Sequence, residues 1–203
     1  MENFKFKGIY KNENQILRGE LPKNAVKFNE SNNMRQLNLS VLLVTIFIVI
    51  ISLMILIHKE LIFEPNPFEK LIIIEIVSIF IGLVLSFLNY FVAMQILYTK
   101  KSEKEVWIYL KYLTIFIYCN EPISRNRFII VNLLPATISG FFPFILWNIG
   151  VFDFNSYLSI FIMLFSLANI LFNIGLLIKS FTAIKQAPKN STIRNHGFNS
   201  YWY

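Results

Sequence analysis

Residues 71–98 read LIIIEIVSIFIGLVLSFLNYFVAMQILY, and Glu75 is the only charged residue among them. A helix of this length is about 42 Å long at roughly 1.5 Å per residue, whereas the hydrocarbon core of a bilayer is about 30 Å thick. Such a helix can cross a bilayer and continue for about two turns into the interface. This stretch therefore predicts an integral membrane protein.

Three more apolar runs accompany this one, at residues 39–57, 128–151 and 157–178. The chain of 203 residues is 55% hydrophobic and contains 21 Phe, which is more apolar and more aromatic than an ordinary soluble domain. We therefore expect an all-α membrane protein with four transmembrane helices. They would form one membrane domain over residues 37–180.

Lysine and arginine are distributed unevenly between the segments that the apolar runs separate. They concentrate before the first run, between the second and third, and after the fourth, whereas the first connection holds only Lys59 and Lys70. Because basic residues favour the cytoplasmic side, we expect a multi-pass protein with both termini and residues 99–127 in the cytoplasm. Residues 1–36 and 181–203 would then be cytoplasmic terminal segments.

The formal net charge of +7 has two interpretations, nucleic-acid binding or a basic cytoplasmic face of a membrane protein. The charges lie between apolar runs, so the second interpretation is favoured, with the lipid bilayer as partner and no nucleic acid. The polar first 36 residues predict no cleavable signal peptide. Heavy use of Ile, Phe, Asn and Lys is typical of an AT-rich bacterial genome, and we expect a bacterial cell membrane.

The connection between the second and third runs is rich in β-branched and aromatic residues. Residues 106–110 read VWIYL and residues 113–119 read LTIFIYC, a pattern that predicts two short strands in a hairpin over residues 105–120. Such a hairpin can present its edge to an extended peptide. Alternatively, it simply covers the end of the second helix.

Small and helix-breaking residues interrupt two of the apolar runs. Ser78, Gly82 and Ser86 follow one another at helical spacing, which predicts a stripe where another helix packs closely. The third run contains prolines and a glycine, and we expect that segment to be kinked or partly re-entrant. The interrupting residues of the third run are Pro135, Gly140 and Pro143.

Residues able to perform hydrolytic chemistry are scarce in this chain. Its two histidines, His58 and His196, lie far apart and are predicted on opposite sides of the membrane, so they make no HExxH motif. Cys119 is the only cysteine, and Asp153 lies in a predicted outer loop. Glu75 is the only acidic residue inside an apolar run. On the residues alone, enzymatic activity is disfavoured.

One stretch is distinctive: residues 117–135 read IYCNEPISRNRFIIVNLLP, with 21–25 reading LPKNA and 195–202 reading NHGFNSYW. These segments resemble a bacterial family of small membrane proteins of unknown function, catalogued as putative zincin peptidases, and the likeness covers residues 20–203. The resemblance implies a fold related to site-2 proteases. It also implies zinc, an HExxH motif at the inner end of the second helix, and an acidic ligand on the last helix.

Carried onto this chain, the metal motif falls on residues of other kinds. Asn89 and Ala93 stand at the expected histidine positions, Tyr90 at the general-base glutamate, and Asn169 at the acidic ligand. None of these side chains is an ordinary zinc ligand or a carboxylate base, so we expect no metal and no cofactor. A purely structural interpretation is also open, with Asn89 and Asn169 as hydrogen-bonding residues between helices and Tyr90 as an interfacial aromatic.

Three hypotheses for function follow. The first is a catalytically inactive member of the family that binds a peptide or another membrane protein. The second is an active metallopeptidase with an unrecognised site or one completed by a partner, and the third is a small transporter or an immunity-type membrane protein. For the first hypothesis, the expected contact residues are Tyr118, Asn120, Glu121, Pro122 and Pro135.

Overall fold

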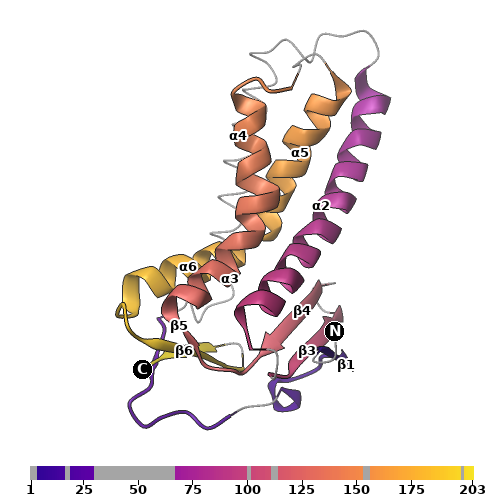
Figure 1. Cartoon of the computed structure of the whole chain (residues 1–203). Coiled ribbons are helices and arrows are strands. Elements are labelled where there is room, and N and C mark those ends of the chain that lie inside the picture. The colour runs from indigo at the N-terminus through magenta and orange to yellow at the C-terminus, as the bar shows by residue number, and fades with distance from the viewer. Residues whose placement is uncertain are drawn as a thin grey trace. The chain divides into compact units, whose positions relative to one another are not determined.

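The computed structural model describes residues 4–16, 19–29, 67–99, 102–110, 114–152, 156–197 and 199–203 (Figure 1). The chain divides into two compact units. We call the first the sheet unit; it contains Met1–Glu30, Phe91–Val131 and Lys179–Tyr203. The second, the helical unit, contains Ser31–Tyr90 and Asn132–Ile178.

Apolar sequence forms the long helices, as predicted. Two stretches, Ile76–Leu97 and Arg125–Asn148, are each long and apolar enough to cross a membrane. A bent pair of helices makes a third candidate if it counts as one span. The predicted span at 39–57 lies outside the described residues, so the total of four spans stays a prediction. The helices are α2 (Pro67–Leu97), α3 (Arg125–Ala136), the π-helix η4 (Thr137–Phe141), α4 (Phe142–Asn148), α5 (Tyr157–Phe172) and α6 (Ile174–Gln186).

The segment from Arg125 to Asn148 is one continuous helix with a π-helical turn, not the re-entrant loop that was one of our expectations. Pro135 cannot donate a backbone hydrogen bond, and the π-helical turn follows it immediately. Two hydroxyls hydrogen-bond to carbonyls of the preceding turn: Thr137 Oγ1 to Leu133 O at 3.0 Å and Ser139 Oγ to Pro135 O at 2.8 Å.

Small residues allow close helix packing within the helical unit. Ser78, Gly82 and Ser86 are all buried, which confirms the predicted packing stripe on α2. A Cβ atom on Gly140 would lie 2.7 Å from Cγ1 of Ile170 and 3.2 Å from its backbone nitrogen, so α5 packs directly against the π-helical turn. Near the far end of the unit, Trp147 Nε1 donates to Ser159 Oγ at 2.8 Å.

The predicted all-α fold is wrong, because the sheet unit contains two β-sheets and the protein is mixed α/β. One sheet has the strand order β1-β3-β4 (Figure 1), and the other has the order β2-β7-β6-β5. The predicted hairpin is confirmed as β3 and β4, which pair antiparallel. The strands are β1 (Phe4–Ile9), β2 (Val26–Lys27), β3 (Lys104–Tyr109), β4 (Thr114–Cys119), β5 (Ile123–Ser124), β6 (Thr192–His196) and β7 (Asn199–Trp202).

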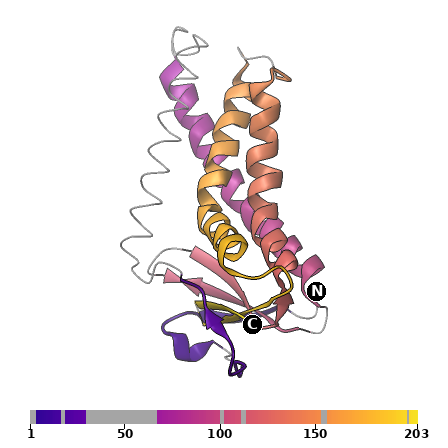
Figure 2. The same cartoon turned by 90° about the vertical axis from the view of Figure 1, so that its left-hand side faces the viewer.

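The two terminal segments, predicted only as polar extensions, supply most of the additional strands. β1 pairs in parallel with β3, where Phe4 is opposite Lys104, and β2 pairs with β7 of the C-terminal hairpin (Figure 2). The β3 edge of the predicted hairpin is therefore covered by the protein's own β1. Such strands pair with partners far away in the chain, which no local pattern reveals.

A mainly aromatic core stabilises the sheet formed by β1, β3 and β4. Tyr10, Ile16, Trp107 and Tyr118 are buried together. The Tyr10 ring meets those of Trp107, Tyr109 and Phe116 edge-on, with centroids 6.2, 4.9 and 5.4 Å away, a geometry that aromatic quadrupoles favour. Cys119 is buried as well, and burial raises the pKa of its thiol.

The contact at Gly140 gives a prediction with a matched control. We expect Gly140→Ala to lower the free energy of unfolding by about 1–3 kcal/mol, because the new methyl group overlaps Ile170. Gly175→Ala is the control, since a Cβ there meets nothing within 4 Å. Thermal unfolding in detergent measures both, and equal midpoints for the two variants would contradict the packing.

Candidate functional site

The sheet unit contains an open hollow of about 360 Å³. It is built from the segment after η1 (Glu13–Gln15), the β3–β4 hairpin with the loop that follows it, and strand β6. The lining residues are Gly19, Ser102, Glu103, Glu105, Tyr118, Asn120, Glu121, Pro122 and Arg194.

The hollow brings together four of the five contact residues expected from the sequence. Tyr118, Asn120, Glu121 and Pro122 all line it, whereas Pro135 is buried in α3 of the helical unit. The sequence analysis missed the other lining residues. A signal for one of them was present, because Arg194 directly precedes the family-like segment 195–202.

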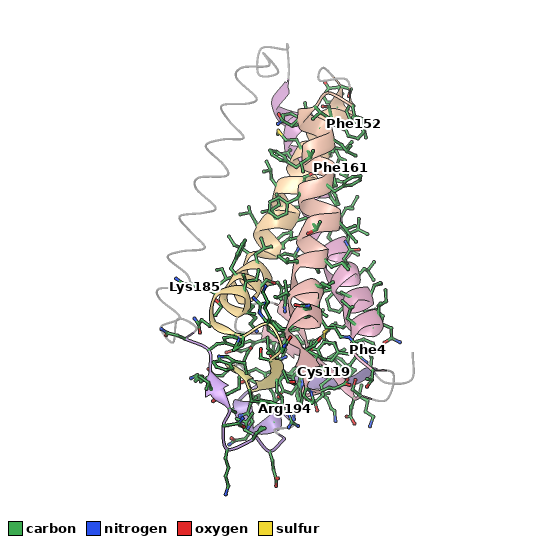
Figure 3. The ribbon with its side chains drawn as sticks, turned by 60° about the vertical axis from the view of Figure 1, so that its left-hand side comes forward. Phe4, Cys119, Phe152, Phe161, Lys185 and Arg194 are labelled. Carbon is green, nitrogen blue, oxygen red and sulfur yellow. The ribbon has the colours of Figure 1, made fainter. Side chains whose placement is uncertain are left out.

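Arg194 belongs to β6 (Figure 3) and connects three separate segments around the hollow. Its Nε donates to Asn120 O at 2.9 Å and to Asn120 Oδ1 at 3.0 Å, and its Nη1 donates to Glu20 O at 2.6 Å. A Cβ atom on Gly19 would collide with this guanidinium group. The absence of a side chain at Gly19 thus gives Arg194 the space it occupies.

Glu121 supplies a negative charge to the hollow. Its Oε2 accepts a hydrogen bond from the backbone N–H of Thr99 at 3.1 Å. Partial burial acts to raise the pKa of this carboxyl, but hydrogen bonds from Ser102 and Thr99 outweigh burial and hold the pKa below its usual range. Glu121 is therefore ionised at neutral pH.

Two further carboxylates line the hollow, and lysines of β1 pair with them. Lys5 Nζ lies 2.9 Å from Glu103 Oε2, and Lys7 Nζ lies 3.0 Å from Glu103 Oε1 and 3.6 Å from Glu105 Oε1. Hydrogen bonds from Lys5 and Lys7 lower the pKa of Glu103. Glu105 is buried and accepts a hydrogen bond from Trp107 Nε1 at 3.0 Å. These ion pairs neutralise much of the local negative charge and secure β1.

Tyr118 has a structural role at the base of the hollow. Its hydroxyl donates to Asn195 O at 3.2 Å and accepts from the backbone N–H of Gly197 at 3.3 Å. Burial is the main reason why its pKa is raised, so the phenol stays protonated at neutral pH. The hydroxyl thereby connects β4 to the β6–β7 hairpin.

The positions assigned to the metal motif lie on α2 and α5. On α2, Asn89 and Tyr90 are half-buried and Ala93 is fully buried. Asn89 and Ala93 are one helical turn apart, the spacing that an HExxH pair requires. Asn169 on α5 is fully buried.

Asn169 lies beside a part of α2 that is nearer the N-terminus of this helix than Asn89. Its Nδ2 donates to Phe165 O at 2.9 Å and would lie 2.9 Å from a Cβ atom on Gly82. Gly82 precedes Asn89 by about two helical turns, or about 10 Å along the axis. The assignment of Asn169 to the same site as Asn89 therefore stays a prediction.

A residue that the sequence analysis overlooked makes a hydrogen bond between helices of the kind expected for the two asparagines. Asn173, at the break between α5 and α6, donates through Nδ2 to Ser86 Oγ on α2 at 2.7 Å. The same nitrogen donates to Asn169 O at 2.7 Å. Asn173 is 2% exposed, so these hydrogen bonds satisfy a buried amide.

The residues at the assigned positions do not fit zinc. Zinc in proteins is held by cysteine, histidine and carboxylate side chains, whereas Asn89, Tyr90, Ala93 and Asn169 offer amides, a phenol and a methyl group. Across the described ranges, no three His, Cys, Asp or Glu side chains are grouped as a metal site would require.

The lowered pKa of Glu121 predicts an acid-dependent loss of stability. A carboxyl with a depressed folded pKa stabilises the fold above its ordinary pKa, about 4.5, and this stabilisation is lost as the pH falls through the folded pKa. We expect Glu121→Gln to unfold with a weaker pH dependence than the wild type below about pH 4.5. Denaturant unfolding from pH 7 to pH 3 measures this, and parallel curves would contradict it.

Comparison with known proteins gives one match. The model of the family described as putative zincin peptidase matches residues 91–192. Ala93 and Asn169 fall inside this range, and Asn89 and Tyr90 lie just before it. No curated protein and no solved structure matches the chain. Because the matched range covers half of the chain, the protein belongs to the putative zincin peptidase family.

Proposed function

We propose that this protein is a non-catalytic member of its family that acts in a membrane by binding a peptide segment of another protein. The observation that carries the proposal is the set of residues at the metal positions: Asn89, Tyr90, Ala93 and Asn169 include no zinc ligand of the usual kind. Its two histidines cannot form an HExxH pair, since they are widely separated in sequence.

The hollow of the sheet unit is the proposed binding site. Its volume of about 360 Å³ lies near the lower end for ligand pockets, which are roughly 300–1,000 Å³, and suits a few side chains of an extended segment. The ionised Glu121 favours a segment that carries a lysine or arginine. Pro122 is exposed beside this carboxylate and offers an apolar contact.

Zinc content tests the loss of catalysis. We expect the purified full chain to contain far less than one zinc per molecule by elemental mass spectrometry. Restoring the motif with Asn89→His, Tyr90→Glu and Ala93→His should raise zinc binding by at least tenfold, because two histidines one turn apart share a helix face.

The two zinc measurements have separate consequences. One zinc per wild-type chain would contradict the non-catalytic proposal. Failure of a folded restored variant to gain zinc would instead contradict the assignment of residues 89–93 to the metal motif. Circular dichroism of the restored variant establishes whether it is folded.

Site-specific cross-linking tests binding in the hollow. We expect a photoreactive amino acid at Pro122 to capture a membrane-associated protein, and one at the exposed Asn126 of the same unit to capture much less. Glu121→Gln should reduce the yield at position 122 several-fold, since it removes the charge. Equal yields at both positions, or a captured peptide that has been cleaved, would contradict the proposal.

A further inference from the structure

Helix α6 has two faces of different chemistry. Ser180 and Ala183 on one face, and Ala187 directly after the end of the helix, are buried in the sheet unit, with exposed fractions of 0%, 0% and 6%. Phe181 and Ile184 lie on the other face and are 64% and 46% exposed. Two large apolar side chains are thus presented outward within one helical turn.

Hydrogen bonds of α6 to neighbouring residues fix the rotation of the helix about its axis, and therefore which side chains it exposes. Arg125 Nε donates to Ala183 O at 3.2 Å, and its Nη2 donates to Ile184 O at 2.9 Å. Ser180 Oγ donates to Ile129 O at 3.4 Å. Rotation of α6 that hid Phe181 would break all these hydrogen bonds.

The position of α6 in the chain indicates what surrounds the outer face. It begins directly after Asn173, where the helical axis bends by 54° relative to α5. The α5–α6 pair is apolar enough to make a candidate membrane span. A helix that leaves an apolar span at this angle runs obliquely through the boundary between lipid tails and headgroups.

Basic side chains border the same face. Lys185, four residues after Phe181 and therefore on its side of the helix, is exposed (Figure 3). Lys189 is exposed in the turn that follows the helix. Exposed Phe and Ile beside Lys is the pattern of a helix in a membrane interface, where the ammonium groups reach anionic headgroups.

We propose that the outer face of α6, formed by Phe181, Ile184 and Lys185, lies in the interfacial layer of a bilayer and contacts anionic lipid headgroups. The alternative occupants are a second copy of the chain or another protein. Each would shield Phe181 from lipid as well as from water, which makes them distinguishable.

Spin-label accessibility in lipid nanodiscs tests the proposal on the full chain. Cys119 is the only cysteine and is buried, so the native chain serves as the unlabelled background. Labels are placed through Phe181→Cys and, as a water-exposed control, through Lys23→Cys in a turn of the sheet unit. We expect the label at position 181 to meet lipid-dissolved oxygen more than a water-soluble nickel complex, with the ratio reversed at position 23.

Two results would overturn the location in the membrane. One is equal access of the nickel complex to both labels, which indicates water. The other is a label at position 181 that is shielded from oxygen and from nickel, which indicates a protein occupant.

The headgroup preference has its own measurement. Lys185→Gln should lower the anionic lipid retained by the purified protein about fivefold, as expected for about 1 kcal/mol per charge. Lys23→Gln, at an exposed lysine in a turn of the sheet unit, is the matched control and should change it little. Equal retention by both variants would overturn the part of the proposal that concerns anionic lipid.

Discussion

The hydrogen bonds of the Arg194 guanidinium group are the interaction on which the candidate site depends. They join β6 to the carbonyl of Glu20 and to Asn120, which belong to segments far apart in the sequence. A charged donor is well suited to this role, because hydrogen bonds from an ionised group are stronger than those between neutral groups. Around it, Glu121 and Tyr118 are held by their own hydrogen bonds, so the hollow is preorganised rather than formed by a ligand.

The helices were predictable because burial in lipid or in a helical bundle leaves a continuous apolar signal, as in α2. The β3–β4 hairpin was predictable for a related reason, since its strands are adjacent in sequence and rich in β-branched and aromatic residues. The remaining strands were missed because β1 reads as alternating lysine and aromatic residues in a basic terminal segment. Its partner β3 is about a hundred residues away, so their pairing is invisible to any local pattern.

In the candidate site, too, only the residues with a local signal in the sequence were predictable. Tyr118, Asn120, Glu121 and Pro122 were found because they belong to one contiguous family-like segment. Glu103, Glu105 and Arg194 were missed because a charged residue in a polar segment gives no indication of which cavity it lines. In the helical unit, the amide that joins α5 to α2 belongs to Asn173. Which asparagine reaches a neighbouring helix depends on helix rotation and on the break at that residue, and periodicity alone fixes neither.

The parallel pairing of β1 with β3 has a consequence for how the protein is made. During synthesis, residues 4–9 emerge long before residues 104–109, so β1 has no partner while α2 is being synthesised. Strand β6, which carries Arg194, is synthesised later still. A nascent chain that stops before Arg194 contains every helix of the described residues and an incomplete hollow. The hollow is therefore completed only after the residues of all the described helices have been synthesised.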